Sequence, residues 1–75
     1  MPRFFFSRVC PEHSVTDIVG ENVADRAEAT RRAREIAMEI ASEQLEAGRA
    51  PSGWVEVEDE AHRPVFMLPL RAVAS

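Results

Sequence analysis

The pattern of hydrophobic and polar positions predicts one long helix over residues 26–47. Asp25 has the residue type of an N-cap, and Glu28 three positions later completes a capping-box pattern. Gly48 and Pro51 mark the end, because glycine favours the position after a helix and proline cannot continue one. One apolar stripe runs along the helix at 100° per residue and contains Ala29, Ala33, Ile36, Ala37, Ile40 and Ala47.

Two strands are expected before this helix. Residues 3–9 are rich in aromatic and β-branched side chains and place apolar residues on both faces. Pro11 lies in the turn that follows, since proline has no N–H to donate to a strand ladder. Residues 14–19 then predict a second strand, which completes a hairpin with the first. We expect the first strand to lie in the interior of the sheet.

Two more strands are expected after the helix. Residues 54–58 alternate between polar and apolar side chains, and 65–70 form an almost continuous apolar run in which Pro69 indicates an edge or an end. The tail over 71–75 is expected to fray. The predicted fold is therefore α+β, with the order β-β-α-β-β: a mainly antiparallel four-stranded sheet with one long helix packed on one face, in a single small domain of residues 1–75.

The distribution of apolar residues predicts a homodimer. One helix covers only one face of such a sheet, yet the first and last strands are apolar on both faces. A second copy could cover the exposed face by packing sheet on sheet or by joining strand edges. The alternative is that the twisted sheet and the tail shield these residues within one chain. The interface candidates are Phe4, Phe5, Phe6, Trp54, Phe66 and Leu68.

Composition narrows the class of protein. The chain has 75 residues, 45% hydrophobic and 29% charged, which is the balance of a small globular domain. A formal net charge of −4 disfavours binding to nucleic-acid phosphates. Cys10 is the only cysteine, so no intramolecular disulfide can form, and a reducing, cytoplasmic location fits best. The N-terminal apolar residues are interrupted too early for a signal peptide, and no run is long enough to span a membrane.

Candidate chemistry is sparse. Cys10 and His13 have the spacing of two zinc ligands, but the only other histidine is His62, and a structural zinc site needs four ligands. A polar turn is the favoured interpretation, and no cofactor or metal is expected. An acidic group in the second hairpin is interpreted as a solvated strand face and turn; its members are Glu56, Glu58, Asp59 and Glu60.

The arginines of the helix do not indicate a nucleic-acid surface. Glu28 and Arg32, and Arg31 and Glu35, are spaced as i, i+4 pairs, which predicts a solvent face whose charges neutralise one another.

Trp54 shares its strand face with acidic residues. Its side chain could either recognise a partner or pack against the end of the sheet, and the sequence does not decide between the two.

Several segments resemble a family of short, uncharacterised bacterial proteins, a domain of unknown function. Its members begin M-P-R-[YF]-F-F and continue with a D-x-x-G turn, an Ala/Arg-rich helix and a G-W strand. The matching segments here are 1–6, 17–21, the helix and 52–57. Two turns depart from the pattern: 10–13 reads Cys-Pro-Glu-His, and His62 stands where a D-E-x-G hairpin has glycine. The resemblance implies a shared fold and no catalytic residues.

These observations favour a small non-enzymatic protein that acts by association. We expect a homodimer that presents a sheet or helix surface to a protein partner. The alternative is a small regulatory module, antitoxin-like or associated with nucleic acid, because compact dimers of a sheet and a helix serve there too.

Overall fold

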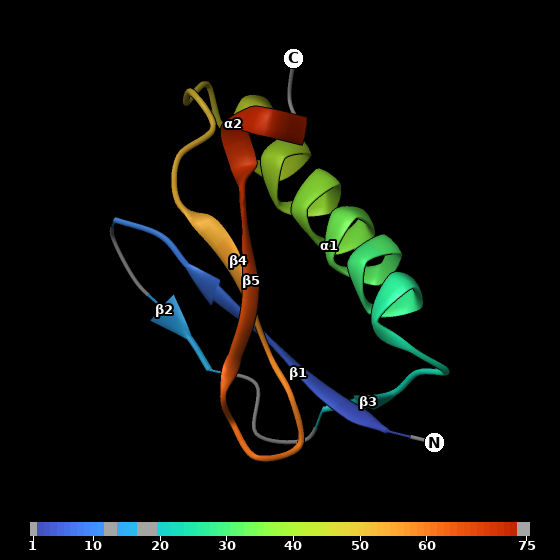
Figure 1. Ribbon diagram of the computed structural model, residues 1–75. Coiled ribbons are helices and arrows are strands. Elements are labelled where there is room, and N and C mark those ends of the chain that lie inside the picture. Colours follow the sequence, from blue (N-terminus) through green and yellow to red (C-terminus); the bar gives the residue numbers. More distant parts are fainter. Residues whose placement is uncertain (1, 12–13, 17–19, 74–75) are drawn as a thin grey trace.

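One long helix crosses one face of a twisted antiparallel sheet in the computed structural model, which describes residues 2–11, 14–16 and 20–73 (Figure 1). The predicted α+β class is confirmed, with five strands in place of four. In chain order the elements are β1 (Arg3–Val9), β2 (Ser14–Val15), β3 (Glu21–Asn22), α1 (Arg26–Glu46), β4 (Trp54–Glu58), β5 (Pro64–Pro69) and α2 (Leu70–Val73).

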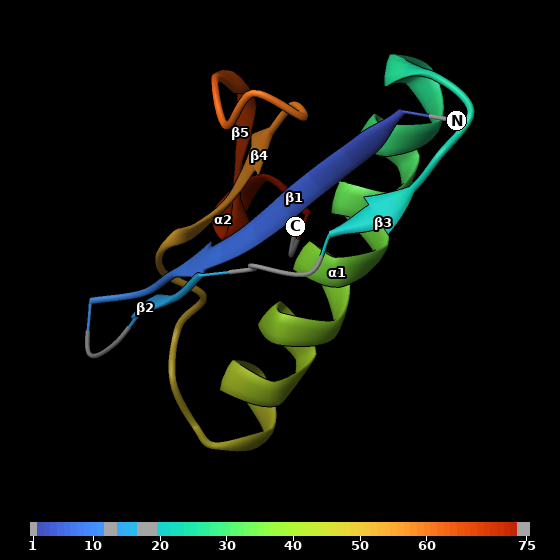
Figure 2. The same cartoon turned by 90° about the horizontal axis from the view of Figure 1, so that it is seen from below.

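Strand β1 lies in the interior of the sheet, whose order is β2-β1-β4-β5. It pairs antiparallel with β4 along its length, from Phe5 opposite Glu58 to Val9 opposite Trp54. Its other edge is shared by β2 and β3, which lie near opposite ends of β1 (Figure 2). Strand β5 pairs with β4 and ends the sheet on the opposite side.

The segment between β1 and the helix differs from the predicted strand over 14–19. Strand β2 contains only Ser14 and Val15, and residues 17–19 lie outside the described residues. Gly20 takes a φ of 75°, a turn conformation that interrupts a strand. The chain then returns to the edge of β1 as β3. Two short strands therefore pair with β1, where the sequence predicted one strand over 14–19.

The last strand ends one residue earlier than the expected range 65–70. Leu70 begins α2 and is fully buried, and its N–H donates a hydrogen bond of 3.0 Å to the carbonyl of Gly53. The expectation of a frayed tail is wrong for residues 71–73, which belong to α2, while 74–75 lie outside the described residues. A short continuous apolar run fits a buried strand and a buried helix equally well, because its periodicity does not distinguish the two.

The core lies between α1 and the sheet. Three alanines of α1 are fully buried, so the helix backbone approaches the sheet closely and the larger sheet side chains fill the space between. The buried members of this cluster are Phe4, Phe6, Val23, Ala29, Ala33, Ala37, Ile40, Val55, Val57 and Leu70.

Both ends of α1 are set by local hydrogen bonds. The Asp25 side chain accepts a bond of 2.9 Å from the N–H of Glu28, and Glu28 Oε2 accepts one of 3.3 Å from the N–H of Ala24. The helix ends at Glu46, and Ala47, which the pattern placed on the buried stripe, is an exposed C-cap. The buried stripe continues through Ala41 and Gln44 instead, whereas Ile36 is only partly buried against the core.

The face of the sheet opposite α1, called the outer face here, is partly covered by the chain itself. The ring of His62 stacks on Phe5 with centroids 4.1 Å apart, and Gly20 also lies against Phe5, which is 7% exposed. The accessible surface of 4799 Å² is close to the about 4,600 Å² expected of a folded monomer of 8.4 kDa. The three phenylalanines of β1 are therefore buried without a partner. No helix among the described residues is long and apolar enough to cross a membrane.

Replacing Gly53 with alanine should destabilise the fold more than the same change at Gly48. Both glycines have positive φ, 95° and 78°, so each alanine takes a conformation that costs about 1–2 kcal/mol. A Cβ at Gly53 would stand 2.2 Å from the carbonyl oxygen of Val9, which adds about 1–3 kcal/mol of strain, whereas nothing lies within 4 Å of a Cβ at Gly48. Urea unfolding of both variants measures the difference, and equal losses would contradict the close approach of β4 to the end of β1.

Candidate functional site

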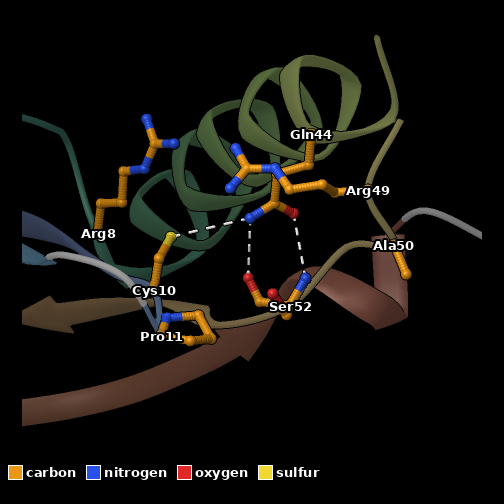
Figure 3. Close-up of a pocket in the computed structure, with 7 residues that line it drawn as sticks. All are labelled: Arg8, Cys10, Pro11, Gln44, Arg49, Ala50 and Ser52. Carbon is orange, nitrogen blue, oxygen red and sulfur yellow. Dashed lines mark hydrogen bonds between the residues drawn. The ribbon is translucent and has the colours of Figure 1, made fainter. Parts of the chain in front are cut away.

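A small pocket lies where the end of β1, the last turns of α1 and the loop before β4 meet (Figure 3). Its volume is about 160 Å³. The lining is mostly polar and contains two guanidinium groups, a carboxamide and a thiol; the residues are Arg8, Cys10, Pro11, Gln44, Arg49, Ala50 and Ser52.

Gln44 holds the walls of this pocket together. Its side chain is buried and forms two hydrogen bonds to the main chain of Ser52, with Nε2 donating to the carbonyl at 3.0 Å and Oε1 accepting from the N–H at 3.1 Å. The same Nε2 lies 3.9 Å from the sulfur of Cys10 (Figure 3). One carboxamide thus ties the end of α1 to the entry of β4 and to the residue that follows β1.

Arg8 occupies the side of the pocket next to Cys10. Its Nη1 donates to Glu43 Oε1 at 3.4 Å, while its Nε is buried and has no hydrogen-bond acceptor among the described residues. The pKa of Arg8 is raised, chiefly by the neighbouring Cys10 side chain and also by Glu43, although burial acts in the opposite direction. The guanidinium is therefore a permanent positive charge with one donor unused.

Of the two candidate metal ligands in the first turn, only Cys10 is among the described residues. Cys10 lines the pocket, and His13 lies outside the described residues. His62 follows β4 beyond Glu58, at the end of the sheet opposite Cys10. Within 2–11, 14–16 and 20–73, no three histidine, cysteine, aspartate or glutamate side chains gather as metal ligands.

The acidic residues of the second hairpin are engaged in local contacts. Glu56 Oε2 accepts a long hydrogen bond of 3.5 Å from the indole N–H of Trp54, and Glu60 Oε1 accepts one of 2.9 Å from the N–H of Arg3. These carboxylates therefore contact the outer face and the first residue of β1.

Asp59 organises the turn between β4 and β5. Its Oδ1 accepts hydrogen bonds from the N–H groups of Ala61 at 2.9 Å and Arg63 at 3.0 Å. The bond from Arg63 is the main cause that lowers the pKa of Asp59 below its ordinary value. Glu58 Oε1 lies 3.2 Å from Nδ1 of His62, the ring that covers Phe5.

The arginines in the first half of α1 pair with nearby glutamates. Arg31 lies 3.2 Å from Glu35, as predicted, and 3.6 Å from Glu28. Arg32 does not pair with Glu28: it donates through Nε to Glu21 of β3 at 2.9 Å, and this contact is the main cause that raises the pKa of Arg32. The predicted pair was wrong because Arg32 faces the neighbouring strand. Arg32 thus links α1 to β3 at the edge of the sheet.

The predicted interface residues fall into three positions. Phe4 and Phe6 lie in the core beneath α1, and Phe5 lies under His62. Phe66 and Leu68 are partly buried against the core from β5.

Trp54 faces the outer side of the sheet, as Phe5 does, and its side chain is half-buried. It borders a shallow hollow of about 260 Å³ along β5. Met67 lines the same hollow and is 53% exposed.

A family model described as "Domain of unknown function (DUF6894)" matches residues 3–71, which is nearly the whole chain and contains all five strands, α1 and the first half of α2. The chain belongs to the DUF6894 family. No curated protein and no solved structure matches it. Membership confirms the resemblance to an uncharacterised family and identifies no enzymatic activity for this DUF6894 protein.

Sequence reasoning missed the pocket of the DUF6894 protein, although one signal pointed to it. Gln44 falls on the buried side of α1, where a polar side chain needs partners. Its partner Ser52 lies eight residues away across a turn, and Arg8 belongs to a strand whose pairing was unknown. The helical spacing of Gln44 from Ile40 could have indicated a buried carboxamide, but not the groups that surround it.

Replacing Gln44 with alanine should destabilise the DUF6894 protein by about 1–3 kcal/mol, because the N–H and carbonyl of Ser52 lose their partners in a partly buried position. Glu46→Ala in the same helical turn is exposed and is expected to change the free energy of unfolding by less than about 0.5 kcal/mol. Urea unfolding followed by circular dichroism compares the two. Equal effects would mean that Gln44 does not clamp the loop.

Replacing Asp59 with asparagine should destabilise the DUF6894 protein at neutral pH and not in acid. Because the pKa of Asp59 is lowered from its ordinary 3.8, the ionised carboxylate stabilises the fold above that value. This contribution is lost as the pH falls through the lower pKa of the folded state, where the wild-type carboxyl is protonated too. Urea midpoints of both proteins across acidic and neutral pH test this, and a constant difference would contradict it.

Proposed function

We propose that this DUF6894 protein acts by association, as a homodimer joined through the outer edge of β5. The observation that carries the proposal is that β5 is an apolar edge strand. It ends the sheet, and no strand lies on its outer side among the described residues. All of its residues from Pro64 to Pro69 are apolar.

The edges of the sheet are unequal. On the β1 side, β2 and β3 pair with the strand and cover parts of its edge. On the β5 side no further strand pairs among the described residues, and the carbonyl of Val65 accepts a hydrogen bond of 3.1 Å from Nη2 of Arg26. An uncovered strand edge offers N–H and C=O groups to another strand, and natural proteins usually protect such an edge with charged side chains. Strand β5 carries none.

A second copy of the chain fits this edge better than a charged partner. Two copies of β5 can pair antiparallel about a two-fold axis, and with Met67 at its centre Phe66 lies opposite Leu68 of the other copy. No charged residue occurs from Pro64 to Leu70, so two chains of net charge −4 meet there without local repulsion. In this register Val65 lies opposite Pro69, so the prolines limit the pairing to the three residues from Phe66 to Leu68.

The folded monomer does not depend on this contact. Its core is complete, and its accessible surface is that of an ordinary small monomer. The short edge supports a modest affinity, so the dimer should form reversibly in the micromolar range. Strand pairing leaves α1 on the surface, where Met38 and Leu45 are exposed among acidic side chains, as the face for a protein partner.

Replacing Met67 with lysine should weaken the dimer, since a charge on a strand edge opposes pairing. Met38→Lys on α1 is the matched control, because Met38 is 51% exposed and Met67 is 53% exposed. Sedimentation velocity over the micromolar range should show a dimer for the wild type and for Met38→Lys. The Met67→Lys dissociation constant should rise at least about tenfold, or about 1.4 kcal/mol.

Two outcomes would overturn the proposal. A wild-type protein that stays monomeric at the highest soluble concentration excludes a homodimer. A dimer that Met38→Lys disrupts and Met67→Lys leaves intact places the interface on α1. Circular dichroism of each variant shows that its fold is retained, so that a loss of association is not a loss of structure.

A further inference from the structure

We propose that the pocket between Arg8 and Arg49 binds a small oxyanion of the phosphate class. The pocket lies beside the end of β1 and the last turns of α1, and none of its lining residues belongs to β5. The inference therefore stands apart from the proposed dimer, and either can fail without the other.

The charge of the lining favours an anion. Two guanidinium groups line the pocket, and no described lining residue carries a carboxylate. Glu43, which pairs with Arg8 at 3.4 Å, lies outside the lining and its side chain is 64% exposed. The lining of the pocket is therefore positively charged, although the chain as a whole has a net charge of −4. Fixed positive charge in a partly enclosed site attracts anions more strongly than the same charge on an open surface.

The geometry of Arg8 leaves the right donors for an oxyanion. Its Nη1 is directed to Glu43, whereas Nε is buried with no acceptor among the described residues. An arginine Nε together with Nη2 forms the fork that holds two oxygens of a phosphate or carboxylate. A buried donor without a partner is unfavourable, and a small turn of the guanidinium toward the pocket would let an anion oxygen accept from Nε.

The pocket is held open by contacts that do not involve a ligand. Gln44 is fixed to both main-chain groups of Ser52, and the N–H of Arg49 donates to the Gln44 carbonyl at 2.9 Å. The carbonyls of Glu43, Gln44 and Leu45 already accept from the main chain of residues 47–49. In Figure 3 the side chain of Arg49 extends across Gln44 toward Arg8. Both arginines line the pocket, whose backbone around Gln44 and Ser52 is held without a ligand.

The volume of the pocket limits the size of the ligand that it can hold. Its volume of about 160 Å³ is below the roughly 300–1,000 Å³ typical of sites for drug-sized molecules. A single phosphate fits this description, either as the free ion or as the phosphate group of a small monoester whose remainder lies outside. Inorganic phosphate and glycerol 3-phosphate are the probes that separate these two sources.

Cys10 supplies a readout that is specific for this pocket. It is the only cysteine of the chain and it lines the cavity, so a thiol reagent such as iodoacetamide labels one known position. Phosphate held between Arg8 and Arg49 would slow labelling of Cys10 in a saturable way. Labelling rates and thermal midpoints are measured with each probe at constant ionic strength, and sodium chloride is the reference salt.

Three variants distinguish an anion site from a structural role of the arginines. Arg8→Lys keeps the charge but removes the buried Nε donor, and Arg49→Gln removes one charge from the wall. Arg34→Gln, on the exposed side of α1, removes one charge elsewhere. We expect saturable protection in the wild type and in Arg34→Gln, and a dissociation constant at least about tenfold weaker in the two pocket variants.

Binding of glycerol 3-phosphate more tightly than inorganic phosphate would identify a monoester as the ligand, and the reverse order would identify the free ion; both support the site. Absence of saturable protection in the wild type overturns the proposal. So does an Arg34→Gln effect as large as that of Arg8→Lys, which would mean unspecific charge screening. If Arg8 and Arg49 only balance the partial negative charge at the end of α1, their variants lower the thermal midpoint equally with and without phosphate.

Discussion

The close approach of α1 to the sheet is the contact on which the rest of this structure depends. Three fully buried alanines allow the helix backbone to lie near β1 and β4, and the side chains of Phe4 and Phe6 fill the space between. A helix of 21 residues is longer than any strand of the sheet, so its last turns reach past the end of β1. The pocket forms there, because Gln44 meets the loop that returns the chain to β4.

Covering one face of the sheet leaves two different surfaces elsewhere. The outer face is partly closed by the turn between β4 and β5, where Asp59 orders the backbone and His62 stacks on Phe5. His62 has a φ of 60°, in the left-handed region that favours glycine. It occupies the position that is glycine in the D-E-x-G hairpin of the family pattern. The strained backbone is thus combined with a ring contact that glycine could not make. The edge at β5 has no such cover, and it remains the apolar surface on which the proposed association rests.

The pocket and the strand edge serve different chemistry. The pocket is small and polar and contains two guanidinium groups, and its backbone is held by the contacts of Gln44 with Ser52 and of Arg49 with Gln44. The edge is apolar and uncharged along its length. The proposed association surface and the proposed anion site therefore occupy separate parts of the molecule.

The sequence by itself determined the fold class, the helix and its N-cap, and the presence of strands on both sides of it, because these follow from local periodicity and from residues that start or end a helix. It did not determine that the segment after Pro11 divides into two strands or that Leu70 turns into α2, since short apolar segments fit either state. Nor could it bring Arg8, Gln44 and Ser52 together. Only the pairing of β1 with β4 under α1 decides that contact, because residues far apart in the chain become neighbours through packing, which no local pattern records.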